Sequence, residues 1–231
     1  MCSKSPLLYD YTVSNELLPR SESVIDLGVT FDCNLSFRDH VAITEARAVK
    51  SMGFIIRNSR DFSNPETLIT LFNSLVRSRL EYASIIWSPT YDVHIDTLEN
   101  ILRKFLKFTC FKLDGVYPCI GYPQSLLLQR FGLSSLESRR KYASVLFLYK
   151  LINAHIDCPD LLGKINLSVP RLSARFPCTF YAGTAHTRAL QSSPLYSMYS
   201  NYHSIQDSVD IFHTSAREIR ESFSAAQRSR S

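Results

Sequence analysis

The sequence predicts a mainly α fold, in which a short N-terminal β-hairpin or strands precede a helical bundle and an irregular C-terminal tail follows it. Three observations support this. A chain of 231 residues with 45% hydrophobic content can bury an ordinary core. Apolar residues change from strand-like to helical spacing after Phe37. Prolines repeatedly interrupt the chain after Cys158. We therefore expect three parts, at residues 1–36, 37–165 and 166–231.

The first part has strand character. Apolar residues up to Val13 precede a turn signal at Ser14-Asn15, and a compact apolar run at 24–31, which contains Gly28, is closed by Asp32. Two or three short strands fit this pattern, with Gly28 expected in a structural role. A hairpin this small cannot bury its own face, so it must pack on the following helices or on a partner sheet.

Helical periodicity then defines the bundle. A first helix is expected from Phe37 to Asn58, and residues 63–66, with Pro65 in the first turn, begin a second helix that runs to Ile86. Trp87-Ser88-Pro89 ends the second helix, because Pro89 disfavours helix at the residue before it. A third helix resumes near Tyr91 and completes an αα-hairpin that reaches Lys112. Trp87 is more consistent with a core anchor than with a base-stacking residue.

The remaining elements are shorter. A helix at 123–131 is stopped by Gly132, and a capping box at 134–137 begins another helix that extends to about Asn153. In the tail, one amphipathic stretch at 205–223 precedes an end expected to be disordered.

Charge and cysteine usage limit the possible classes of protein. The net charge of +5 permits a polyanionic partner, although 21 carboxylates are mixed among 26 basic side chains. No targeting signal or membrane-spanning apolar run is present, so we expect an intracellular protein with no membrane partner. The six cysteines lack paired spacings, and His155, Cys158, Cys178 and His186 lack the tight ligand pairs of a zinc site, so we predict no metal.

Catalytic motifs are also missing from the sequence. It contains no phosphate loop, nucleophile elbow, zinc-protease motif or dinucleotide fingerprint. Two groups of basic residues stand out instead. Arg103, Lys104 and Lys107 lie towards the end of the third helix, where cations favour the helix dipole whatever their function. Arg139 and Arg140 lie near a helix start, where cations oppose the dipole, although solvated surface residues remain an alternative.

The order of several short motifs resembles a known family. The matching segments are Asp26-Leu27-Gly28-Val29, Phe31-Asp32, 35–40 (LSFRDH), 53–57 (GFIIR), 75–84 (LVRSRLEYAS), Trp87-Ser88-Pro89 and 133–140 (LSSLESRR). In this order they resemble the carboxy-terminal part of reverse transcriptases from non-LTR retrotransposons of the jockey type. The similarity covers about residues 24 to 165.

The resemblance implies a polymerase thumb without its palm. Residues 7–32 correspond to the closing palm hairpin and 37–112 to the helical thumb that holds a template-primer duplex by its backbone. Polymerases of this family use Mg²⁺ held by palm carboxylates, but this sequence has no Asp-Asp pair. We therefore expect no cofactor and no catalysis by this chain alone. The missing fingers and palm are expected partners, and the oligomeric state is left open.

The resemblance also directs attention to basic side chains as phosphate contacts in a shape-reading mode, without assigning any single residue. The candidates are Arg47, Lys50, Arg77, Arg79, Arg103, Lys104, Lys107, Arg139 and Arg140. The functional expectation is a truncated reverse-transcriptase fragment that binds the backbone of an RNA or DNA duplex nonspecifically. A stand-alone helical interaction module and a nonfunctional remnant are the alternatives.

Overall fold

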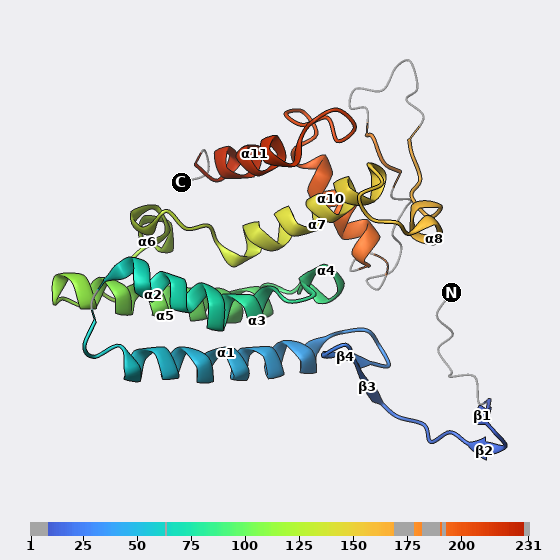
Figure 1. Ribbon diagram of the computed structural model, residues 1–231, viewed down its shortest axis with the longest axis horizontal. Coiled ribbons are helices and arrows are strands. Elements are labelled where there is room, and N and C mark those ends of the chain that lie inside the picture. Colours follow the sequence, from blue (N-terminus) through green and yellow to red (C-terminus); the bar gives the residue numbers. More distant parts are fainter. Residues whose placement is uncertain (1–8, 63, 169–177, 182–189, 191–192, 229–231) are drawn as a thin grey trace.

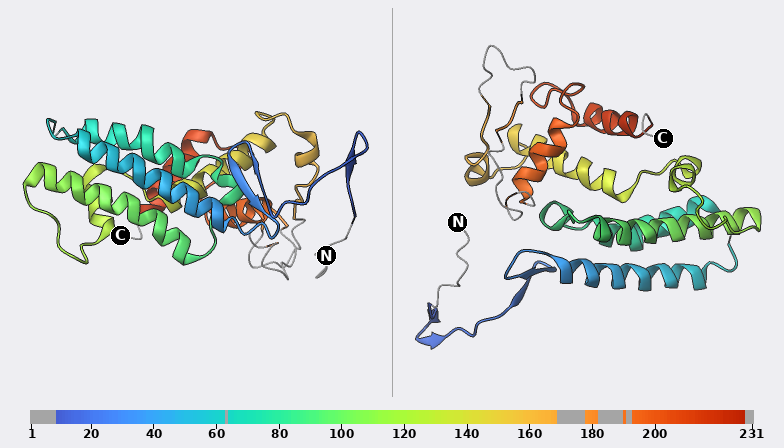
Figure 2. Two further views of the ribbon diagram at one scale, coloured as in Figure 1. Left: turned by 90° about the horizontal axis from the view of Figure 1, so that it is seen from below. Right: turned by 180° about the vertical axis from the view of Figure 1, so that it is seen from behind.

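The computed structural model describes residues 9–62, 64–168, 178–181, 190 and 193–228. It is mainly helical, with short antiparallel strand pairs at the N-terminus, as the sequence predicts (Figure 1). The helices lie in rough layers (Figure 1). α1 (Arg38–Asn58) lies beside α2 (Pro65–Phe72), α3 (Ser78–Glu81) and α5 (Asp92–Asp114). Next come α7 (Leu136–Ile152) and then α10 (Pro194–His203) and α11 (Ala216–Arg228). The strand pairs extend from one end of α1 (Figure 2). The start of the predicted hairpin before residue 9, the end expected to be disordered at 229–231, and His186 lie outside the described residues.

Two hairpins form the N-terminal region. β1 (Thr12–Val13) pairs with β2 (Glu16–Leu17), and β3 (Ser23–Asp26) pairs with β4 (Val29–Asp32). Both turns have two central residues with positive φ, at Ser14-Asn15 and at Leu27-Gly28, as type I′ turns require. The apolar run at 24–31 therefore contains a turn at its centre. Val29 on β4 is buried in the core, whereas Ile25 on β3 is 69% exposed.

A three-helix bundle holds the main core. It consists of α1 (Arg38–Asn58), the rod made of α2 (Pro65–Phe72), the π-helical η1 (Asn73–Arg77) and α3 (Ser78–Glu81), and α5 (Asp92–Asp114). The rings of Phe72 and Phe105 stack at its centre with centroids 4.2 Å apart. The helix starts at Pro65 with Asn64 as its N-cap, which accepts a 2.9 Å hydrogen bond from the Glu66 amide, as the sequence predicts.

The second helix ends earlier than predicted. The sequence indicates a helix to Ile86, but α3 ends at Glu81. Ala83 adopts a left-handed conformation with a φ of 51°, and a separate turn, α4 (Ser84–Trp87), follows. The break is stabilised by Trp87, whose indole N–H donates a 2.7 Å hydrogen bond to the Tyr82 carbonyl. Trp87 is 1% exposed and lies in the core before the Pro89 corner.

The break also fixes the β3–β4 hairpin. The Tyr82 hydroxyl donates a 2.9 Å hydrogen bond to the Leu27 carbonyl in the hairpin turn. Gly28 has φ +82°, and a Cβ built on it would meet the Tyr82 ring at 3.7 Å, which is ordinary contact. Glycine is therefore favoured at this position by its backbone conformation rather than by lack of space.

The second half of the chain packs on α7 (Leu136–Ile152), which follows α6 (Gln124–Phe131). Around α7 lie α10 (Pro194–His203) and α11 (Ala216–Arg228), while α8 (Pro159–Leu162) is a single turn. Val145 and Leu148 of α7 belong to the same apolar cluster as Phe180, Tyr202 and Ile219. This cluster includes residues on both sides of the boundary that the sequence suggests at residue 165.

The N-cap of α7 is displaced by one residue from the predicted capping box. The Ser135 side chain, not that of Ser134, accepts a 3.2 Å hydrogen bond from the Ser138 amide. The Glu137 amide is instead bonded to a Glu99 carboxylate oxygen at 2.7 Å. A side chain of α5 therefore takes over part of the capping of α7, which a local sequence motif cannot reveal.

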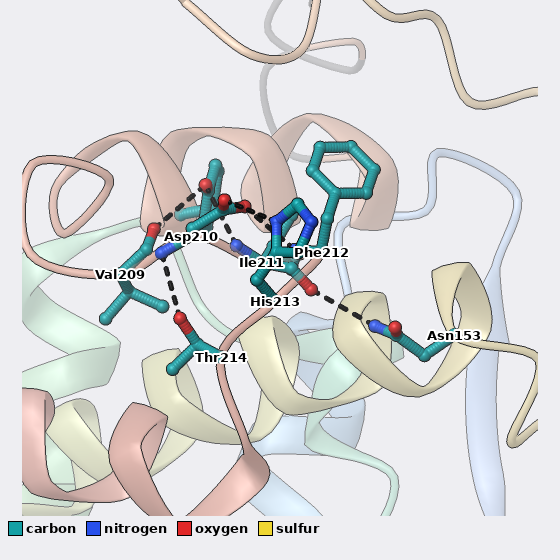
Figure 3. Close-up of polar contacts among 8 residues, drawn as sticks. Asn153, Val209, Asp210, Ile211, Phe212, His213 and Thr214 are labelled. Carbon is teal, nitrogen blue, oxygen red and sulfur yellow. Dashed lines mark hydrogen bonds and ion pairs between the residues drawn. The ribbon is translucent and has the colours of Figure 1, made fainter.

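A turn at 209–214 closes the C-terminal cluster (Figure 3). The Tyr202 hydroxyl donates to the Val209 carbonyl at 3.0 Å, and the Asn153 amide donates to the Ile211 carbonyl at 3.1 Å. Asp210 accepts from the Phe212 amide at 3.0 Å and pairs with His213 at 2.8 Å. These hydrogen bonds lower the pKa of Asp210. The bonds from Asn153 and Tyr202 tie the turn to the end of α7 and to α10.

His40 connects the hairpin, α1 and Trp87. Its Nδ1 accepts a 3.2 Å hydrogen bond from the Thr30 amide, and its ring meets Trp87 edge-on with centroids 4.9 Å apart. An accepting Nδ1 requires the neutral imidazole. Burial, and secondly the positive charge of Arg47, lower the pKa of His40 below its usual value.

This arrangement predicts a pH-dependent stability. Below about pH 6.5 the unfolded chain takes up a proton at His40 that the folded chain resists, so the free energy of unfolding should fall as the pH drops from about 7 to 5. His40→Asn, which retains a hydrogen-bond acceptor but does not titrate, should show a shallower fall. Urea denaturation at several pH values tests this, and identical pH profiles for the two proteins would contradict it.

Candidate nucleic-acid interface

Three of the nine basic residues predicted from the sequence converge on one surface groove. It has a volume of about 420 Å³ and lies between α1 and the η1–α3 segment. We call it the basic groove. Its lining residues are Arg47, Lys50, Ser51, Phe54, Leu75 and Arg79.

The helical spacing of α1 explains one wall of the groove. Arg47, Lys50 and Phe54 are separated by three and four residues, which places them on one face. The buried face of the same helix carries Val41, Thr44, Ala48, Met52 and Ile55. Packing of this apolar face against the bundle therefore directs the basic face outward.

The opposite wall comes from η1 and α3, where Leu75 and Arg79 lie four residues apart. The wider turn of the π-helical segment η1 contains Leu75 and so lies beside the groove. Segments of this kind often occur at functional sites. Sequence periodicity could not reveal the π segment, because its residues continue the apolar pattern of α2. The groove thus combines residues about thirty positions apart in the sequence.

The positive charge of the groove is not neutralised by nearby carboxylates. Across the described ranges, no ion pair involves Arg47, Lys50 or Arg79. None of the six lining residues is acidic. A groove of this kind attracts anions and can contact phosphate.

Glu81 is the carboxylate closest in sequence to Arg79, but it pairs elsewhere. Both of its oxygens accept from the Arg139 guanidinium, through Nε to Oε1 and through Nη2 to Oε2, the latter at 3.0 Å. Arg77 Nε lies 3.9 Å from the same carboxylate. Glu81 therefore joins α3 to α7, and it leaves Arg79 without a partner on its own helix.

Arg77 and Arg139 thus belong to an ionic cluster around Glu81 rather than to the basic groove, and Arg140 also lies outside that groove. The bond to Glu81 raises the pKa of Arg139, whereas burial and the neighbouring Arg139 charge lower that of Arg77. Arg140 is only 3% exposed, and burial lowers its pKa despite the nearby charge of Glu99. Arg139 holds α7 against α3 through Glu81, whereas the three buried guanidinium nitrogens of Arg140 form no hydrogen bond with the described residues.

Glu99 is a second buried carboxylate in this region, and its charge acts on that of Arg140. Burial raises the pKa of its carboxyl, although hydrogen bonds from the Glu137 amide and the Gln124 side chain oppose this effect. The Gln124 bond is 2.8 Å long and comes from the first residue of α6. One buried side chain of α5 therefore positions the starts of both α6 and α7.

The α5 cations have different environments. Arg103 donates to the Gln124 and Asn100 side chains at 3.0 and 2.8 Å, and Lys107 donates to the Cys119 carbonyl at 2.9 Å. Lys104 is exposed and takes part in no ion pair among the residues described. Arg103 and Lys107 thus hold the segment that leads to α6, while Lys104 is available to solvent.

Other arrangements offer less chemistry. Asp210 and His213 form an exposed pair within one turn, and their neighbours in Figure 3 supply structural hydrogen bonds rather than a nucleophile aligned with the histidine. Among the described positions, no group of three His, Cys, Asp or Glu residues could hold a metal ion. The described helices also include none that is long and apolar enough to cross a membrane.

Phe54, Ser51 and Leu75 are groove residues that the sequence did not single out as site residues. A signal for Phe54 existed, because it continues the three- and four-residue spacing of Arg47 and Lys50. No comparable signal existed for Leu75, whose apolar side chain fits the pattern of a core residue.

The two groups of arginines should respond differently to substitution. Arg139→Met breaks a two-point bond to Glu81 and should lower the free energy of unfolding by about 1–3 kcal/mol. Arg79→Met removes an exposed, unpaired charge and should change it by less than about 0.5 kcal/mol. Guanidinium denaturation of both variants tests the distinction, which would be refuted by equal losses of stability.

Comparison with protein-family models, with curated proteins and with solved structures gave no match to this chain. The strongest functional indication is therefore physical, namely a groove with three unpaired cations and no acidic lining residue.

Proposed function

We propose that this chain is a thumb-like fragment of a non-LTR retrotransposon reverse transcriptase and that it binds nucleic acid through the basic groove. The observation that carries the binding proposal is the convergence of Arg47, Lys50 and Arg79 on one surface groove. Lys104, exposed on α5, is an additional contact candidate. The assignment to the polymerase family rests on the order of its sequence motifs.

The proposed contacts are electrostatic and independent of base sequence. Guanidinium and ammonium groups on a helical scaffold can neutralise phosphates and release counterions, which supplies affinity but no base readout. Ser51 adds a hydroxyl to the groove, although its donor is bonded to the Arg47 carbonyl at 3.1 Å. The Ser51 oxygen can then only accept further hydrogen bonds, and phosphate oxygens are themselves acceptors. Phosphate contact is therefore assigned to the three cations.

We propose no catalytic activity for the chain by itself. Two-metal nucleotidyl transfer requires carboxylates that hold the ions a few ångströms apart, and the sequence has no Asp-Asp pair. The parent polymerases would use Mg²⁺ through their palm. Metal-dependent DNA synthesis by the purified chain would refute this part of the proposal.

A second candidate function, a protein-interaction module, is favoured by the exposed hairpins. The side chains of Val24, Ile25 and Leu27 are all more than half exposed, and so are those of Tyr11 and Val13. Exposed apolar strands can add to the edge of a partner sheet. In the polymerase interpretation, the partner for this surface is the palm.

The salt dependence of binding tests the basic groove. Fluorescence anisotropy with a labelled DNA duplex should show affinity that falls steeply with salt. The triple substitution Arg47→Gln, Lys50→Gln and Arg79→Gln should reduce the magnitude of the log–log slope by about 2–3, because each phosphate contact contributes about 0.9.

A matched triple variant controls for net charge. Lys150→Gln, Lys164→Gln and Arg217→Gln remove the same formal charge from exposed positions outside the groove. This variant should retain the slope of the unmodified chain. Equal losses in the two triple variants would contradict a localised site, and a salt-independent interaction would favour the protein-interaction module.

A further inference from the structure

The basic groove contains an aromatic side chain that phosphate binding does not require. Phe54 is 54% exposed and lies near the C-terminal end of the 21-residue helix α1. It is not among the residues that form or border the two apolar clusters. The packing of α1 therefore does not explain its position.

Phe54 lies between cations on the same face of α1. Arg47, Lys50, Phe54 and Arg57 follow one another at intervals of three, four and three residues. At a rise of 1.5 Å per residue, this stripe is about 15 Å long. Leu75 and Arg79 face its first part across the groove. An exposed ring thus has positive charge on both sides along the helix.

The Arg57 guanidinium lies close to the glycine that precedes Phe54. A Cβ built on Gly53 would lie 3.2 Å from Arg57 Nη1, so the guanidinium passes over the backbone at Gly53. Within the described part of the chain, Arg57 forms no ion pair, and no cation lies over the Phe54 ring. The ring and its flanking charges are thus available together.

We infer that the basic groove binds single-stranded nucleic acid, with an unpaired base stacked on Phe54 and the adjoining phosphates on Arg47, Lys50, Arg79 and Arg57. This inference rests on the proposed function and narrows its ligand. Alternating cations and aromatic surface are the features that bind single strands without sequence preference. The volume of about 420 Å³ lies in the range of sites that enclose a small organic group.

A duplex cannot use Phe54 in the same way. The bases of a duplex are stacked on one another, so their faces are not open to a side chain, and only phosphates and groove edges remain accessible. The cations should therefore bind both kinds of nucleic acid, whereas the ring should contribute to single strands alone. This difference separates the inference from backbone binding in general.

The experiment compares ligands of equal length on the full chain. Fluorescence anisotropy is measured at one salt concentration with labelled oligo-dT, oligo-rU and a blunt DNA duplex. Phe54→Ala should weaken single-strand binding by about 5- to 150-fold, the range for loss of one stacked base, and leave duplex binding unchanged. Phe54→Leu, which retains apolar volume without a ring, should behave in the same way.

Phe212→Ala is the matched control, because Phe212 is also exposed but lies in the C-terminal turn of Figure 3. It should bind all three ligands as the unmodified chain does. A thermal melt of each variant by circular dichroism verifies folding. Since Phe54 is exposed, its substitution should leave the melt unchanged.

The outcomes distinguish this inference from the proposed function. Weaker binding of Phe54→Ala to oligo-dT or to oligo-rU, with binding to the duplex unchanged, supports stacking on Phe54. Equal losses on single strands and duplex, or no loss on single strands, would overturn the inference while leaving phosphate binding intact. If the groove triple variant binds every ligand as well as the unmodified chain, the proposed function itself fails, and the inference fails with it.

Discussion

The hydrogen bond from the Trp87 indole to the Tyr82 carbonyl is the interaction on which the rest of the arrangement depends. It stabilises the break after α3, where the helix gives up its regular bonds and Ala83 takes a positive φ. The break turns the Tyr82 hydroxyl towards the hairpin, and Trp87 itself packs against His40. Burial of so large a side chain contributes about 3–5 kcal/mol, enough to offset a strained residue at about 1–3 kcal/mol.

The ionic network on α7 determines which cations remain free for a ligand. Glu81 is the last residue of α3, and its carboxylate is held by Arg139 and Arg77. If Glu81 instead faced the basic groove, its charge would reduce the attraction of that groove for phosphate. Stable docking of α7 and positive potential in the groove therefore have a common cause, the direction in which one carboxylate points.

Local sequence signals were sufficient for much of the fold but not for the site. The helix starting at Pro65 and the helix stopped by Gly132 are fixed by cap and stop residues close by in the sequence, and the structure confirms both. The break at Tyr82 has no glycine or proline to mark it, because Trp87 and the hairpin impose it through tertiary contacts. Likewise, the sequence indicates nine basic candidates, but Glu81 and Arg139 are 58 positions apart, so their pairing depends on the fold.

The two candidate functions use surfaces with different physical signatures. The hairpin surface around Ile25 and Leu27 is apolar, so a partner there would gain affinity by burying area, with little dependence on salt. The basic groove has three cations without acidic partners, so its affinity must decrease as salt rises. The two surfaces are carried by different elements, the hairpin by β3 and the groove by α1 with η1 and α3. Occupation of one surface therefore does not preclude occupation of the other, so the bundle could bind nucleic acid while the hairpin remains free to pair with a sheet.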